Sequence, residues 1–269
     1  MTSTLLFALA QLNPTVGDIA GNTRKLIEAR DKAAAQGADI VLAPETYLSG
    51  YQIDDLVQVE GILPRIDEAI AQLTEATSDG GPAVIVGAPR RDGEVIRNSV
   101  FVLDGGDVAA IRDKVRLPGT SVFDEPRNFT PGAMSGPVML RGALIGLPIC
   151  EDMWHQDVVE CIDESGAEFF ISCNGSPYVE DKTDDRMMAT IARVTETGKP
   201  LIYLNLVGGQ DVVVYDGASV DVSAGGQIGA YLASFTETVA LVEGKKTNEG
   251  WRFQGAVIKP DTGNTTLSR

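Results

Sequence analysis

Cysteine and histidine are scarce in this sequence. Three cysteines (Cys150, Cys161 and Cys173) and one histidine (His155) occur among 269 residues. An odd and sparse set of cysteines does not make a disulfide framework, so we expect a reducing compartment, the cytoplasm. With one histidine and no CxxC or HxxH spacing, the chain lacks the pattern of a zinc site, and we predict no metal.

Basic residues and long apolar runs are also few. The chain has 22 Lys and Arg against 38 Asp and Glu, a formal net charge of −16. This excess of negative charge argues against nucleic acid or an anionic membrane as the main partner. No apolar run is long enough to cross a bilayer, and no N-terminal stretch has the pattern of a secretory signal.

The sequence does contain the pattern of a large α/β domain. Its residues are 43% hydrophobic and 22% charged, which is ordinary for a globular chain of this length. Strand-like runs at 4–12, 38–45 and 82–89 alternate with helical patterns at 22–36 and 65–77. We expect Asn22 to cap the first helix and Gly37 to end it.

The rest of the chain combines hairpins with further helices. Runs 98–104 and 107–114 are joined by Gly105-Gly106, which is typical of a hairpin. Runs 138–150, 167–174 and 199–207 alternate with helical segments near 158–165 and 183–197, and strands and turns follow from 212. Helices interspersed with hairpins favour layered sheets flanked by helices over a purely parallel doubly wound fold.

Several apolar runs end abruptly at polar or reactive residues. These residues are Glu45, Lys114, Cys150 and Asn174. In α/β sheets, ligands bind beyond the carboxyl ends of strands. We therefore expect these four side chains to lie beyond the carboxyl ends of strands, although they come from separate segments.

Cys150 is the candidate nucleophile. Glu151 and Asp152 follow it directly, and their negative charges disfavour a thiolate. If Glu45 lies near the thiol it can accept the proton, while Lys114 favours the thiolate and stabilises an oxyanion. The backbone N–H after the nucleophile would be a second oxyanion donor. This set suits attack on an amide carbonyl or a nitrile.

Each of these residues alone also has a structural interpretation. A cysteine after an apolar run is commonly part of the core, a glutamate after proline is compatible with a turn, and a lysine at a strand end with a solvated charge. His155 is an alternative base for Cys150, although its place close by in the sequence gives it poor reach. We expect Cys161 and Cys173 to belong to the core.

The combination of motifs is far more specific than any single residue. The sequence contains ALAQLNPTVGDIAGN, APETYLSGYQIDDL, DKVRLP, VFDEPRNFTPG, GLPICEDMW, NGSPY and NLVGGQDVVVYDGAS. From about Leu9 to Ser219, these stretches resemble the glutaminase domain of glutamine-dependent NAD synthetases, in the nitrilase (carbon–nitrogen hydrolase) superfamily. The superfamily needs only the Glu, Lys and Cys blocks, whereas TVGD, CEDMW and VGGQD…DGAS point to the synthetase branch.

The resemblance implies a mechanism. In it Glu45 is the base, Lys114 the oxyanion stabiliser and Cys150 the nucleophile. The cysteine forms a thioester and releases ammonia, and water then hydrolyses the thioester to glutamate. Glu125 is implied as a supporting carboxylate that orients Lys114, and Glu151 as a second supporting residue. We expect no cofactor.

The implied substrate contacts are less complete. The positions that match are Ser176 and Lys182, whose charge suits the α-carboxylate of glutamine. A turn hydroxyl and a solvated charge are their structural alternatives. The family's LPNYGVFDE reads LPGTSVFDE here, so Thr120 stands where a tyrosine contacts glutamine. Leu206 stands where the family's NQVGGQD has its first glutamine.

The resemblance also predicts the domain and its partners. We expect residues 1–269 to form one α/β domain with a four-layer α-β-β-α sandwich, and no ATP-binding synthetase domain. The nearest stretch to an SGGxDS loop, SAGGQIG at Ser223, lacks the acidic and serine positions, so we do not expect the chain to make NAD alone. The expected partners are a small amide (glutamine first), a synthetase domain or subunit, and further copies of the chain. The alternatives are an amidase for another small amide and a non-catalytic interaction module.

Overall fold

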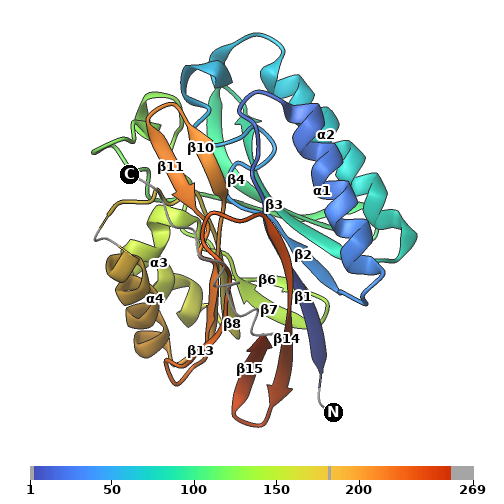
Figure 1. The fold of residues 1–269 in the computed structure, drawn as a ribbon, viewed down its shortest axis with the longest axis vertical. Coiled ribbons are helices and arrows are strands. Elements are labelled where there is room, and N and C mark those ends of the chain that lie inside the picture. Colours follow the sequence, from blue (N-terminus) through green and yellow to red (C-terminus); the bar gives the residue numbers. More distant parts are fainter. Residues whose placement is uncertain (1–2, 181–182, 256–269) are drawn as a thin grey trace, which may run out of the picture.

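Two β-sheets lie face to face in the molecule, and a pair of helices covers the outer face of each sheet (Figure 1). The computed structural model describes residues 3–180 and 183–255. The predicted four-layer α-β-β-α sandwich is confirmed.

The first sheet has seven strands in the order β15-β14-β1-β2-β3-β4-β5. Their bounds are β1 Thr4–Gln11, β2 Ile40–Leu42, β3 Ala83–Asp92, β4 Val95–Asp104, β5 Asp107–Asp113, β14 Thr238–Thr247 and β15 Gly250–Gly255. The pairs β1–β2 and β2–β3 are parallel, and the outer pairs are antiparallel. The β4–β5 hairpin turns at Gly105-Gly106, as predicted.

The second sheet has six strands in the order β13-β12-β9-β8-β7-β6. Their bounds are β6 Val138–Leu140, β7 Ala143–Gly146, β8 Phe169–Asn174, β9 Leu201–Asn205, β12 Val220–Val222 and β13 Ile228–Tyr231. A separate two-stranded ribbon consists of β10 (Val207–Gln210) and β11 (Val213–Asp216). The central strands β7, β8 and β9 are parallel, so their carboxyl ends point to the same edge.

Helices α1 (Ile19–Ala34) and α2 (Ile62–Ala76) cover the first sheet, and α3 (Gln156–Glu164) and α4 (Thr183–Thr197) cover the second. Short 3-10 turns occur at η1 Asp54–Gln58, η2 Thr77–Asp79, η3 Glu125–Arg127 and η4 Cys150–Trp154. In α1 the buried Leu26, Ala29 and Ala33 recur at helical spacing and form the face that packs on the sheet. No helix in the described parts of the chain combines the length and apolar character that a bilayer crossing requires.

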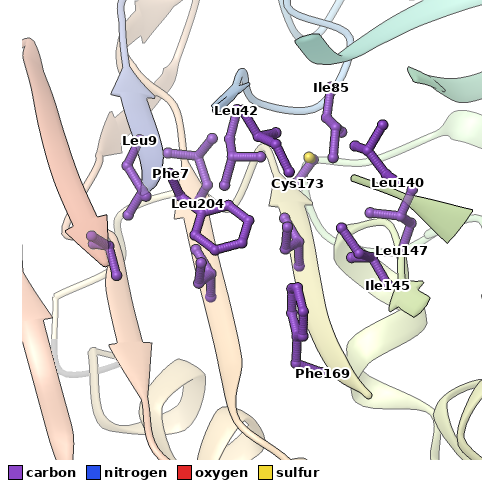
Figure 2. Packing of buried hydrophobic residues seen from close by; sticks show 14 of the residues in the cluster. Phe7, Leu9, Leu42, Ile85, Leu140, Ile145, Leu147, Phe169, Cys173 and Leu204 are labelled. Atoms are coloured by element: carbon purple, nitrogen blue, oxygen red, sulfur yellow. The ribbon is translucent and has the colours of Figure 1, made fainter. Parts of the chain in front are cut away.

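Aromatic side chains fill the space between the two sheets. Phe169 of the second sheet packs against Phe7 of the first, with ring centroids 5.7 Å apart, and against Trp251 at 5.1 Å. Both contacts are edge-on, the arrangement that the ring quadrupole favours. Figure 2 shows Phe7 and Phe169 among the apolar side chains of this layer, together with Cys173.

Two local predictions were wrong. Helix α1 begins at Ile19, capped by Asp18, whose side chain accepts a hydrogen bond from Gly21 N at 3.0 Å. Asn22 lies inside the helix, and its side chain donates to the backbone O atoms of Thr15 and Leu48. The run 138–150 is also two strands, because the chain turns between β6 and β7 at Arg141.

Candidate active site

The three predicted catalytic residues come from both sheets. Glu45 lies in the turn after β2, and Lys114 follows β5 directly. Cys150 opens η4, past the end of β7. The side chains of Glu45 and Lys114 have no solvent exposure, and Cys150 is 6% exposed. Segments that follow β2, β5 and β7, far apart in the sequence, thus place a carboxylate, an ammonium and a thiol in the interior of the protein.

Lys114 is held between two carboxylates. Its Nζ lies 2.6 Å from Glu45 Oε1 and 2.9 Å from Glu125 Oε1. Burial alone lowers the pKa of a lysine, but the charges of the two glutamates outweigh it and hold the pKa of Lys114 well above its usual range. Lys114 therefore remains an ammonium ion in the buried site.

Both oxygens of Glu45 have further partners. Asn98 Nδ2 donates to Oε1 at 2.8 Å, and the backbone N–H of Gly175 donates to Oε2 at 2.9 Å. Asn98 lies on β4, and its backbone O accepts from Lys114 N at 2.8 Å. The sequence did not single out Asn98. In the sequence, Asn98 stands out only as a polar residue at the start of the otherwise apolar run 98–104.

Glu125 lies against Lys114, where the resemblance implied it. Tyr51 donates from its hydroxyl to Glu125 Oε1 at 2.8 Å, a partner that was not predicted. Burial raises the pKa of Glu125 to about 7, with Glu45 adding to the effect and Lys114 opposing it. The carboxyl group is therefore poised between its two protonation states near neutral pH.

Cys150 is a thiol in a strained turn. Its φ of 45° lies in the left-handed region, which is costly for a residue other than glycine. Burial, followed by the charge of Glu45, raises the thiol pKa well above its usual range, while Lys114 and the Gly175 N–H act in the opposite direction. The thiol therefore reacts only when a neighbouring group removes its proton.

Two glycines permit the close approaches that the site needs. A Cβ atom on Gly87 of β3 would lie 2.3 Å from Thr46 N, within the turn that carries Glu45. A Cβ atom on Gly175 would lie 2.2 Å from the ring of Tyr51. Side chains at these two positions would displace Glu45 or the tyrosine that supports Glu125.

A cavity of about 320 Å³ opens above Cys150. Glu151, Thr120 and Ser176, which the sequence predicted as site residues, all line it. Its other walls include Phe123, Trp154, Tyr178, Asp185, Arg186 and residues 212–214 of the β10–β11 ribbon. The predicted substrate residue Lys182 lies outside the described residues. The volume is at the small end of the range for small-molecule sites.

Other residues considered in the sequence lie elsewhere. His155 Nε2 lies 3.4 Å from Glu151 Oε1, and its side chain is 41% exposed, whereas Cys150 is buried. Leu206 is buried in a cluster with Tyr51 and Tyr215, behind the cavity wall.

The remaining two cysteines differ from each other. Cys173 belongs to the core between the sheets, as predicted. The prediction for Cys161 was wrong, because its position on α3 leaves it partly exposed. Among the side chains that the structure describes, those of residues 3–180 and 185–255, no three of His, Cys, Asp or Glu group closely enough to hold a metal ion.

Comparison with known proteins identifies the family of the chain. Residues 6–252 match the family model of the carbon–nitrogen hydrolases. The chain is 42% identical over 264 residues to the glutamine-dependent NAD(+) synthetase of Rhodobacter capsulatus, a match that covers 98% of this chain and 48% of the relative. The chain thus spans about half the length of the synthetases it matches.

Two solved structures have the same fold. The glutamine-dependent NAD+ synthetase of Acinetobacter baumannii superposes with a TM-score of 0.88 at 29% identity, covering 93% of this chain and 47% of that one. An amidase from Nesterenkonia sp. superposes with a TM-score of 0.79 at 26% identity, covering 89% of both chains. Family model, sequence and fold agree, and this chain belongs to the carbon–nitrogen hydrolase family.

Proposed function

We propose that this chain hydrolyses the side-chain amide of glutamine and supplies the ammonia for NAD synthesis. The observation that carries the proposal is the buried Glu45–Lys114 pair, whose charges act on the Cys150 thiol, together with a cavity that Cys150 lines. The similarity of nearly the whole chain to a glutamine-dependent NAD(+) synthetase supports the choice of substrate.

In the proposed reaction, Glu45 accepts the proton of the Cys150 thiol as the sulfur attacks the amide carbon. The Lys114 ammonium and the N–H of Glu151 stabilise the oxyanion. The C–N bond then breaks, the nitrogen takes the proton from Glu45, and ammonia leaves a thioester behind. Glu45 next accepts a proton from water as the water oxygen attacks the thioester carbon. The C–S bond then breaks, Glu45 returns the proton to the sulfur, and glutamate leaves the restored thiol and carboxylate.

The electrostatics of the site suit these roles. Because burial raises the pKa of Cys150, the resting nucleophile is neutral and needs a base within the site. Because the two glutamates raise the pKa of Lys114, that side chain is a fixed positive charge and does not compete as a base. The hydrogen bonds from Asn98 and Gly175 orient the Glu45 carboxylate.

We assign substrate contacts to residues of the cavity wall. Ser176, which is 7% exposed, and Thr120, which is more exposed, both line the cavity. Glu151, the residue after the nucleophile, also lines the cavity, and we assign it a supporting role. Lys182, beyond the described residues, is proposed to bind the α-carboxylate of glutamine.

The remaining proposals concern the setting of the domain. We infer that residues 1–269 act as one glutaminase domain that works with a synthetase domain or subunit, because the matching synthetases are about twice as long. A homo-oligomer and a cytoplasmic location remain predictions from the sequence.

A second candidate is an amidase that acts on another small amide. Two observations favour it. Thr120 lines the cavity where the family motif has a tyrosine, and the Nesterenkonia amidase matches this chain over 89% of its own length.

Ammonia release separates the two candidates. The chain is incubated with glutamine, with other ω-amides and with simple nitriles, and Cys150→Ala is the matched control. We expect glutamine to give the highest kcat/KM and the variant to give none. Higher kcat/KM on another amide would select the second candidate, and equal release by Cys150→Ala would reject both.

A further inference from the structure

Asp152 links the segment that carries Lys114 to the segment that carries Cys150. The carboxylate is 2% exposed and accepts three backbone hydrogen bonds. Oδ2 accepts from Ile149 N at 3.1 Å, while Oδ1 accepts from Val115 N at 3.1 Å and from Arg116 N at 2.8 Å. Hydrogen bonds from N–H groups to a carboxylate are stronger than those between neutral groups.

The donors stand directly beside the two reactive residues. Val115 follows Lys114, and Ile149 precedes Cys150. These residues follow β5 of the first sheet and β7 of the second, so no ladder of strand hydrogen bonds joins the two segments. One buried side chain therefore fixes one backbone relative to the other.

We propose that Asp152 is a positioning residue, which holds the Lys114 ammonium and the Cys150 sulfur at their working separation. This inference rests on the proposed function, because it assumes that both groups act on the same carbonyl. Asp152 does not line the cavity, so it acts through the two segments and not by contact with substrate.

The local geometry explains why such a link is needed. Cys150 adopts a left-handed conformation, which persists only when the surroundings hold it. Asp152 closes the same turn, since its own N–H donates to Ile149 O at 3.0 Å. Val115 also packs against the apolar cluster that contains Met153 and Val158. A further link is the ion pair of Arg116 with Asp157, whose side chains are 41% and 51% exposed. Exposed pairs of this kind contribute little.

The test replaces Asp152 by its neutral isostere. Asp152→Asn keeps one acceptor oxygen but places an amide N–H₂ against a backbone donor. A displacement of about 1 Å between reacting groups costs on the order of 10²-fold in rate. We expect kcat for glutamine to fall by about that factor while KM is unchanged, since the cavity wall is intact.

Asp221→Asn is the matched control. Asp221 is also buried, and it accepts a backbone hydrogen bond from Ala230 N at 2.6 Å between β12 and β13, away from the cavity. Both variants lose a buried carboxylate, so both should lower the melting temperature, but only Asp152→Asn should lower kcat. Should Asp152→Asn fail to fold, Asp152→Ser is measured in the same way.

Alkylation of Cys150 gives a readout that does not depend on turnover. If Lys114 moves away from the thiol, the thiolate of Cys150 is less favoured. A rise of one unit in the thiol pKa lowers the thiolate fraction about tenfold. We expect iodoacetamide to label Cys150 about tenfold more slowly in Asp152→Asn than in Asp221→Asn at pH 8. Equal kcat and equal labelling in the two variants would overturn the inference. A wild type that releases no ammonia from any amide would instead reject the proposed function, and the labelling rates would still decide on Asp152.

Discussion

Lys114 Nζ lies 2.6 Å from Glu45 Oε1, with both side chains fully buried. The two residues are 69 positions apart in the sequence and meet because β2 and β5 belong to the same sheet. Each charge helps to compensate the other inside the protein, so the loss of Lys114 leaves the Glu45 carboxylate buried without a cation, and the loss of Glu45 leaves Lys114 with Glu125 alone. The pair is the electrostatic centre of the proposed mechanism.

Substitution within this pair should remove activity. We expect Glu45→Gln and Lys114→Ala each to lower kcat for glutamine by at least about 10²-fold, because the first loses the base and the second an oxyanion donor. Glu168→Gln is the control, since Glu168 forms an ion pair with Lys246 outside the cavity. Steady-state ammonia assays on the three variants test the assignment. Near-normal turnover in either site variant would remove that residue from the mechanism.

The protonation of Glu125 should affect stability as pH changes. The folded protein holds this proton up to about pH 7, whereas the unfolded chain releases it near 4.5. Between these values the folded state binds more protons, so the contribution of Glu125 to the free energy of unfolding falls as pH rises, by up to about 1.4 kcal/mol per pH unit. Glu125→Gln cannot titrate and should lack this fall. Urea unfolding of both proteins from pH 4.5 to 7.5 measures it, and parallel pH profiles would contradict the prediction.

A methyl group on β3 should disturb the base. Gly87→Ala places a Cβ 2.3 Å from the backbone of the Glu45 turn, so the turn must move. We expect kcat to fall by about 10²-fold, the cost of a displacement near 1 Å. Gly225→Ala is the control, because a Cβ there would meet nothing within 4 Å. Loss of activity in both variants, or in neither, would argue against this explanation of Gly87.

The threonine at position 120 should make the binding of glutamine weaker than a tyrosine there would. It lines the cavity where the family motif has a tyrosine, and a lost contact of this kind weakens binding by about 1–3 kcal/mol, roughly ten- to a hundredfold. We expect the chain alone to hydrolyse glutamine with a high KM, and Thr120→Tyr to lower that KM. Thr120→Ser controls for the loss of the threonine itself. Tight and fast hydrolysis by the wild type would contradict the expectation.

Much of the architecture could be predicted from the sequence. The alternation of strand and helix patterns indicated layered sheets, and motif resemblance identified Glu45, Lys114 and Cys150 from separate segments. The structure brings the first two into contact and places the third in the lining of the cavity. The errors are local. Asp18 and Asn22 are both good capping residues, and the structure decides between them, because Asp18 accepts from Gly21 N while the side chain of Asn22 bonds to Thr15 and Leu48.

The supporting residues could not be predicted, because their roles depend on which segments meet. Asn98 reads as one polar residue in a strand, and its contact with Glu45 exists only when β4 lies beside β5 and the turn after β2. Tyr51 looks like any aromatic residue until its hydroxyl is placed against Glu125. Asp152 was interpreted only as a nearby negative charge, because its three backbone donors come from both sheets.

The central claim is that a γ-glutamyl thioester forms on Cys150, and hydroxylamine tests it most directly. Hydroxylamine competes with water for an acyl-enzyme, so the wild type incubated with glutamine and hydroxylamine should form γ-glutamyl hydroxamate together with ammonia. Cys150→Ala, which keeps Glu45 and Lys114, should form neither product. Ammonia release without hydroxamate, or hydroxamate formation by Cys150→Ala at the rate of the wild type, would contradict the thioester mechanism.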